Sequence, residues 1–194
     1  MSSKLLAHDA VVADELPQPA DRLRRLYLAR FAFAIAWAGT FALSATTISP
    51  LSGTLLVLYP VFDVFAAVVD HRSSGSSRHR ALLVTNMALS LLTAVGLALA
   101  AASGIPNVLR VWGAWAITAG LVQLVVAISR RRLAGQWPLI LSGGISALAG
   151  AAFVLGAAGS EPSLTGIAGY AALGGVFFLV SALRLRRAQL APSR

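Results

Sequence analysis

The stretch "LLVLYPVFDVFAAVVDHR", residues 55–72, is long and apolar enough to cross a membrane, but it carries a proline and a carboxylate. A helix of about 20 apolar residues spans the hydrocarbon core of a bilayer, which is roughly 30 Å thick. Pro60 cannot donate a backbone hydrogen bond to the carbonyl of Leu56, which predicts a helix kink. Asp63 follows within one turn, and an ionisable residue inside a span indicates a partner or a function.

The rest of the chain has the same apolar character, with 57% hydrophobic and only 12% charged residues among 194. Its mean hydropathy of +0.76 is also above that of a typical soluble domain. A soluble helical bundle would need polar helix faces, which the apolar segments lack. We therefore predict an integral membrane protein with spans at residues 28–45, 51–69, 81–102, 111–129, 137–158 and 164–183.

Short loops with turn-forming residues connect the spans, so consecutive helices are expected to run antiparallel as hairpins. The second and third hairpins resemble each other, because a shift of 54 residues aligns Gly96 with Gly150 and Gly120 with Gly174. The first hairpin fits this repeat less well. The predicted fold class is an all-α membrane protein, with six transmembrane helices arranged as three parallel-repeated helical hairpins, residues 24–72, 80–132 and 135–188.

Arginines collect on one predicted side of the membrane: before the first span, in the second and fourth loops, and after the last span. Because Lys and Arg close to a span are retained in the cytoplasm, both termini are predicted to be cytoplasmic. The formal net charge of +9 follows largely from these arginines, which favours the lipid bilayer as a partner and no nucleic acid. The predicted domains are a cytoplasmic N-terminal tail, a six-span membrane domain and a cytoplasmic C-terminal tail, residues 1–20, 21–188 and 189–194.

Residue types that carry enzyme chemistry are sparse in this chain. The absence of cysteine excludes disulfides, thiolate metal ligands and cysteine nucleophiles. His71 and His79 share a loop crowded with arginines, which would repel a metal cation. The sequence has no nucleophile elbow, phosphate-binding glycine loop or HExxH motif. We therefore predict a protein that is not an enzyme and has no catalytic residues, no metal and no cofactor.

Polar side chains inside the predicted spans occur at one depth. Counted inward from the cytoplasmic ends of their helices, Asp63, Asn86 and Gln123 each lie roughly 9–10 Å deep. Arg30 lies opposite Asp63 across the first hairpin, and a carboxylate beside a guanidinium stays ionised. The predicted intramembrane polar layer is therefore Arg30, Asp63, Asn86 and Gln123, beside the kink at Pro60. Such a layer either fixes helix register through internal hydrogen bonds or responds to protons.

Glycines and alanines at regular spacing predict close helix packing, because small residues let membrane helices approach each other. The expected contacts lie within the chain or at the seam of a homo-oligomer. The predicted packing positions are Gly39, Gly96, Gly120, Gly143, Ala147, Gly150, Ala151 and Gly174.

Aromatic residues with a polar group suggest two roles. Trp112 and Trp115 lie near the outer end of a predicted span, and Tyr27 and Trp137 lie near cytoplasmic ends, so all four are predicted to anchor at the membrane interface. Trp37 falls nearer the middle of the membrane and is predicted to pack in the core.

The stretches "GQWPLILSGGISALAGAAFVLGAAG" and "GIAGYAALGGVFFLVSALRLRR" carry a further signal, with a fainter echo in residues 80–132. Their pattern of Gly, Ala and Arg resembles the HdeD-like acid-resistance membrane proteins, which are built from short repeats. The resemblance implies a multi-pass protein of the bacterial inner (plasma) membrane, associated in some relatives with acid stress. It supplies no active-site residues.

Two functional hypotheses follow. The first is a non-enzymatic membrane protein that supports envelope or acid-stress resistance through helix packing, or by binding a second copy or another membrane protein. The second is a small proton-linked transporter or channel that uses the polar layer around Asp63. Parallel repeats favour the first, because many transporters use inverted repeats. A flux that depends on Asp63 would favour the second.

Overall fold

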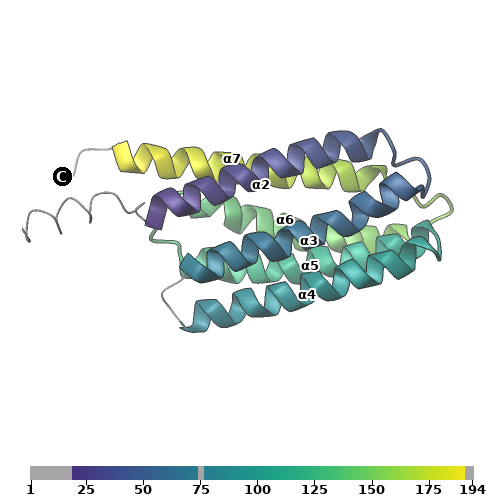
Figure 1. Ribbon diagram of the computed structural model, residues 1–194, viewed down its shortest axis with the longest axis horizontal. Coiled ribbons are helices and arrows are strands. Elements are labelled where there is room, and N and C mark those ends of the chain that lie inside the picture. Colours follow the sequence, from purple (N-terminus) through teal and green to yellow (C-terminus); the bar gives the residue numbers. More distant parts are fainter. Residues whose placement is uncertain (1–18, 74–76, 191–194) are drawn as a thin grey trace, which may run out of the picture.

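The computed structural model describes residues 19–73 and 77–190, which form six α-helices (Figure 1). Successive helices run in opposite directions, so the first and last described residues lie at the same end of the bundle. We call this the terminal end, and we call the opposite end, with the connections 43–49, 102–104 and 157–164, the loop end. The helices are α2 (Pro19–Ala42), α3 (Pro50–Ser73), α4 (Ser77–Ala101), α5 (Ile105–Ser129), α6 (Gln136–Gly156) and α7 (Thr165–Leu190).

The six helices form a closed ring in which each helix packs against its neighbours in the chain and α7 packs against α2. Packing is closest between α5 and α6, between α2 and α7, and between α3 and α4. The predicted hairpins correspond to α2–α3, α4–α5 and α6–α7, and the helices within these pairs contact each other less. The tightest packing therefore joins helices of different hairpins.

The ends of the membrane domain differ from the sequence prediction. Residues 19–20 and 189–190, assigned to the tails, belong to α2 and α7. The rest of the predicted tails, residues 1–18 and 191–194, lies outside the described residues. The first span was expected to reach residue 45, but α2 ends at Ala42 because the chain tightens there, with the Ser44 N–H donating to the Phe41 carbonyl at 2.9 Å.

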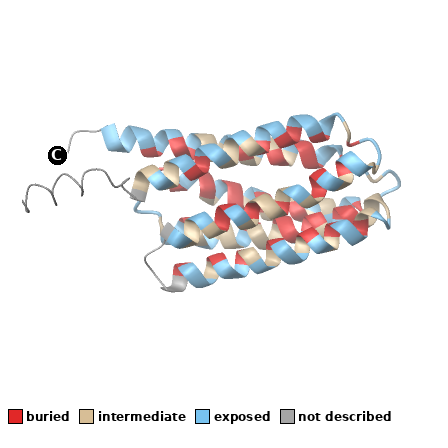
Figure 2. Ribbon diagram, in the orientation of Figure 1, coloured by how far each residue is buried: buried red, intermediate tan, exposed pale blue. Residues whose placement is uncertain are grey.

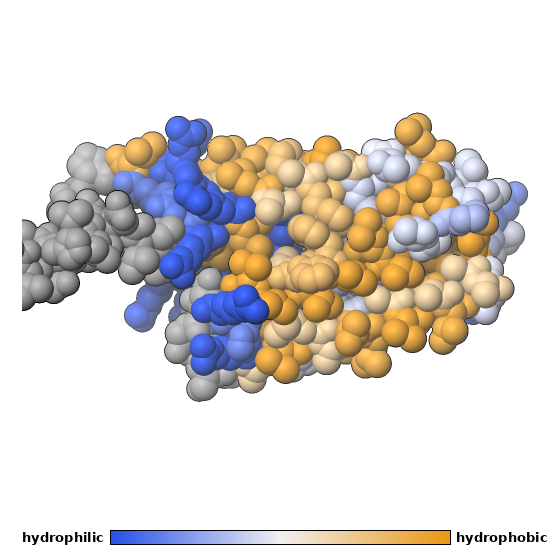
Figure 3. All heavy atoms as spheres, viewed as in Figure 1, coloured by the Kyte–Doolittle hydropathy of each residue, from blue (hydrophilic) through white to orange (hydrophobic). Residues whose placement is uncertain are grey.

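Within the described residues, five helices, α3 to α7, are long and apolar enough to cross a membrane. Large apolar side chains such as Leu92, Leu99 and Leu148 are exposed, whereas buried residues lie on the faces that meet other helices (Figure 2). Hydrophobic residues form a broad band along the bundle, and strongly hydrophilic residues gather at the terminal end (Figure 3). So large an exposed apolar surface favours contact with lipid, and these are the features of an integral membrane protein.

The closest helix pair, α5 and α6, meets along a seam of small residues. A Cβ added to Gly143 would lie 2.7 Å from the Gly120 carbonyl oxygen, and one added to Gly150 would lie 2.5 Å from that of Gly113. Between these contacts, the Ser146 hydroxyl donates to the Ala116 carbonyl at 2.9 Å. Only glycine permits backbones to approach this closely, so the seam depends on these positions.

Several predicted packing positions lie off this seam. Ala147 and Ala151 are half-buried, and the seam uses Ser146 instead, because steps of four residues drift around a helix with 3.6 residues per turn. A Cβ at Gly96 would lie 3.2 Å from a methyl group of Val111, which is tighter than most Cβ contacts and would require this side chain to shift slightly. Gly39 and Gly174 do not mediate close packing, because an added Cβ would meet no heavy atom of the described chain within 4 Å.

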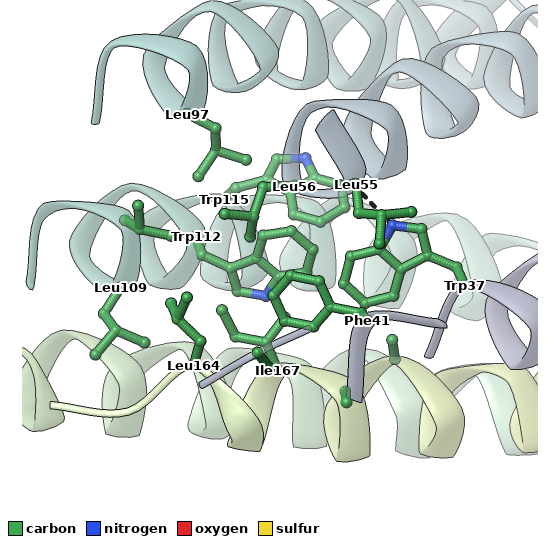
Figure 4. Packing of buried hydrophobic residues seen from close by; sticks show 14 of the residues in the cluster. Trp37, Phe41, Leu55, Leu56, Leu97, Leu109, Trp112, Trp115, Leu164 and Ile167 are labelled. Carbon is green, nitrogen blue, oxygen red and sulfur yellow. Dashed lines mark hydrogen bonds between the residues drawn. The ribbon is translucent and has the colours of Figure 1, made fainter. Parts of the chain in front are cut away.

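Aromatic residues fill the loop-end half of the ring (Figure 4). The Trp112 ring centroid lies 5.6 Å from that of Trp37 and 5.4 Å from that of Trp115, and Trp37 stacks on Phe41 at 4.6 Å. Trp37 also donates its indole N–H to the Leu55 carbonyl at 2.7 Å, so its predicted core position is confirmed. The interface role predicted for Trp112 and Trp115 is wrong: both are buried, because they face into the ring rather than towards its surface.

Candidate functional site

Asp63, on α3, accepts hydrogen bonds from three side chains in the interior of the ring. Its Oδ1 accepts from Arg30 Nη1 of α2 at 2.9 Å, and its Oδ2 accepts from Asn86 Nδ2 at 2.6 Å and Ser90 Oγ at 2.8 Å, both of α4. Ser90 Oγ in turn accepts from the indole Nε1 of Trp115 on α5 at 3.0 Å. One carboxylate thus connects four helices, and we call these five residues the Asp63 cluster.

The cluster contains three of the four residues of the predicted polar layer. Gln123 is not bonded to it, because its Nε2 donates to the Leu139 carbonyl of α6 at 3.2 Å. Ser90 was missed, although it lies one turn after Asn86 on the same face of α4 and this spacing could have identified it. Trp115 was missed as a member because its position in the sequence suggested an interface residue.

Pro60 lies one turn before Asp63 and is fully buried inside α3, which continues through it as one helix. Its missing N–H frees the carbonyl of Leu56 from the usual helical bond. The kink expected at this position stays a prediction. Close to Asp63, the Arg30 guanidinium also lies 5.1 Å from the centroid of the Phe178 ring of α7, a cation–π distance that connects the cluster to a fifth helix.

A second ion pair lies nearer the terminal end. Arg130, just after α5, donates from Nη1 and Nη2 to the two carboxylate oxygens of Asp70 at 3.0 and 2.8 Å. The side chains are only 15% and 13% exposed. The sequence placed Arg130 among the arginines of the fourth loop and Asp70 at the end of the second span, and it carried no signal that the two would meet across the ring. Tyr27, predicted to anchor at the interface, is buried nearby.

A cavity of about 120 Å³ lies between these ion pairs, lined by residues of all six helices. It is large enough for several water molecules or a small solute. Figure 3 shows a small hydrophilic area near the middle of the otherwise hydrophobic face. Aromatic rings, including Phe177 and Phe178, form part of the wall. The polar residues that line the cavity are Tyr27, Arg30, Tyr59, Asp63, Asp70, Asn86, Gln123, Arg130, Gln136, Ser142, Ser146 and Tyr170.

Gln136, the first residue of α6, differs from the other polar residues of the lining. It is only 1% exposed, and neither atom of its side-chain amide makes a hydrogen bond of full geometry with the described residues; its polar neighbour is the Tyr27 hydroxyl, which interacts with it more weakly. Gly135 positions it: this residue is left-handed, with φ 83°, and an added Cβ would lie 2.6 Å from the Ser181 carbonyl oxygen of α7. Any larger residue would be strained at this turn, which holds Gln136 against the cavity. Sequence reasoning did not identify Gln136.

Residues 19–73 and 77–190 bring together no group of three or more His, Asp or Glu side chains that could hold a metal ion. Comparisons with protein-family models, curated proteins and solved structures found no match for this chain. The resemblance to HdeD-like proteins therefore rests on the quoted repeats alone. The chemistry available in the cavity is hydrogen bonding beside two internal ion pairs.

Proposed function

We propose that this chain is a non-enzymatic, six-span protein of the bacterial inner membrane that carries a small polar solute through its internal cavity. The proposal adds α2 to the five apolar helices, because α2 closes the ring between α3 and α7. Exposed arginines of α2 lie at the terminal end, as do those that follow α5 and those of α7. The tendency of arginine to stay in the cytoplasm supports a cytoplasmic terminal end.

The observation that carries this proposal is a polar cavity inside an otherwise apolar ring. Polar groups in a membrane protein are costly, and those inside spans commonly mark the path of a substrate or ion. If the polar residues served only to fix helix register, the protein would be more stable with the helices packed closely around them, because an unfilled cavity loses van der Waals contacts. The cavity beside the Asp63 cluster therefore supports solute passage.

The Asp63 cluster supports a second candidate function. Both carboxylate oxygens of Asp63 already accept hydrogen bonds, from Arg30 on one side and from Asn86 and Ser90 on the other. Such a saturated carboxylate suits a purely structural role in holding four helices in register. In that case the protein would support the envelope through its packing or through a membrane partner.

Flux measurements on the full chain in proteoliposomes distinguish the two functions. We expect protons or small solutes to cross faster than in protein-free vesicles. Ala119 lines the cavity, so Ala119→Phe should fill it and lower the flux by about tenfold or more, because passage depends on pore width. Ala114→Phe, the same change at an exposed position of α5, is the control and should keep the wild-type flux. Flux equal to that of protein-free vesicles for every solute and for protons would favour the structural function.

A further inference from the structure

The charged side chains that line the cavity are already paired with each other. Arg30 lies 2.9 Å from Asp63, and Arg130 lies 2.8 Å from Asp70. These two arginines and two aspartates are the only charged residues in the described lining, so their formal charges cancel. An ion entering the cavity would lose its hydration without gaining an available countercharge, or it would have to break one of these pairs. The pairing therefore favours an uncharged solute.

Gln136 offers the hydrogen bonds that such a solute would need. A side-chain amide presents a donor and an acceptor side by side, and in Gln136 both are buried without a hydrogen bond of full geometry to the described residues, the Tyr27 hydroxyl interacting only weakly. A buried polar group without a partner is destabilising, so a ligand that pairs with both atoms gains affinity from satisfying them. The complementary ligand group has an acceptor next to a donor, as in an amide, a urea or a pair of neighbouring hydroxyls.

The remaining walls combine the features of a site for a small, partly apolar molecule. Ser142 and Gln123 line the cavity, and the Tyr170 hydroxyl lies 2.6 Å from Ser146 Oγ, so hydroxyl and amide groups are spread along the lining. Phe177 and Phe178 supply apolar surface beside them. Small-molecule sites commonly have this character: mostly apolar walls with a few polar groups that set orientation.

We infer that the cavity selects a small uncharged solute with adjacent hydrogen-bond donor and acceptor groups, and that the Gln136 amide is the contact that recognises it. The inference rests on the proposed solute path and goes beyond it by naming the class of solute. Under this inference Gln136 does not stabilise the fold, which separates its role from that of the Asp63 cluster.

The test uses the full chain in proteoliposomes and measures osmotic swelling by light scattering. Acetamide, urea and glycerol are the uncharged probes, and acetate and glycine are charged probes of similar size. We expect at least one uncharged probe to enter about tenfold faster than into protein-free vesicles, and Gln136→Leu to remove this gain. Gln189→Leu makes the same chemical change at an exposed position of α7 outside the cavity lining, and it should keep the gain.

Thermal unfolding in detergent provides the second measurement. Gln136→Leu should melt at the wild-type temperature or above it, because the variant replaces an unpaired buried amide with an apolar side chain of similar size. A clear fall in melting temperature would mean that Gln136 is bonded within the protein, and it would overturn the inference. Uncharged flux that survives Gln136→Leu would do the same.

The probes also separate this inference from the proposed function. Faster entry of protons or charged probes, without faster entry of uncharged probes, would leave the solute path in place and overturn the solute class. Faster entry of water alone would overturn the solute class as well. Rates equal to those of protein-free vesicles for all probes, water and protons would overturn both.

Discussion

The two halves of the helix ring are built differently. In the loop-end half, Trp37 stacks on both Phe41 and Trp112, and the fully buried side chains of Leu97 and Leu164 pack in the same half (Figure 4). In the half nearer the terminal end, one ion pair joins the neighbouring helices α2 and α3, a second joins α3 to the residue after α5, and a cavity of about 120 Å³ lies between them. One half is filled by packed side chains, and the other contains a cavity beside hydrogen-bonded ion pairs.

Trp115 lies at the boundary between the halves. Its ring packs against Trp112 with centroids 5.4 Å apart, and its indole N–H donates to Ser90 of the Asp63 cluster at 3.0 Å. Large aromatic side chains remove space efficiently, whereas charged groups that bind each other direct their atoms to partners rather than to close packing. The comparison indicates that the loop-end half is a closely packed frame and that the polar half contains the candidate site.

The largest effect is expected in the aromatic half. Trp112 is 0% exposed, and Trp112→Ala should lower the free energy of unfolding by about 3–5 kcal/mol, because it leaves a large cavity in a closely packed cluster. Thermal or denaturant unfolding in detergent measures this loss. Trp137→Ala removes a side chain that is 63% exposed and should cost less than about 1 kcal/mol. Equal losses from the two variants would contradict the difference in burial.

A smaller effect is expected from Asp63→Ala in the polar half. Removing one partner of a buried ion pair costs about 3–5 kcal/mol, and we expect the lower end of that range, because the adjacent cavity can admit water to Arg30. The same unfolding assay measures it.

The double variant Arg30→Met with Asp63→Leu is the control for this prediction. It removes both charges and should be less destabilised than Asp63→Ala, since no unpaired charge remains. A double variant that is less stable than Asp63→Ala would show that the pair contributes more than it costs to bury.

The smallest effects come from adding one methyl group to each half. Gly150→Ala, in the loop-end half, brings the new Cβ to 2.5 Å from the Gly113 carbonyl oxygen and should destabilise the protein by about 1–3 kcal/mol. Gly174→Ala, at the cavity wall, meets open space and should stabilise α7 by about 0.5–1 kcal/mol, because alanine is the better helix former. Melting temperatures in detergent should move in opposite directions. A lower melting temperature for both Gly150→Ala and Gly174→Ala would mean that the polar half is as closely packed as the aromatic half.

Much of the architecture was predictable from local pattern. Apolar runs separated by short loops predicted six membrane-crossing helices; six helices are present in the described residues, and five of them, α3 to α7, are long and apolar enough to cross a membrane. The polar residues within spans were also visible, because Arg30, Asp63 and Asn86 are rare residue types in such segments. Their depth could be counted from helix geometry, which is why three members of the Asp63 cluster were identified together.

The sequence by itself therefore determined the helices, their alternating direction and the depth of their polar residues, since each depends on chain length and residue type along one helix. Only the tertiary structure decided which helix faces turn inward. Trp112 is buried rather than at the interface, Gln136 faces a cavity, and Arg130 meets Asp70 across the ring. The physical reason is that lipid and protein interior are both apolar, so polarity distinguishes the two faces of a membrane helix poorly. Close packing between distant parts of the chain decides which face of each helix turns inward. The cavity lies where this packing is incomplete.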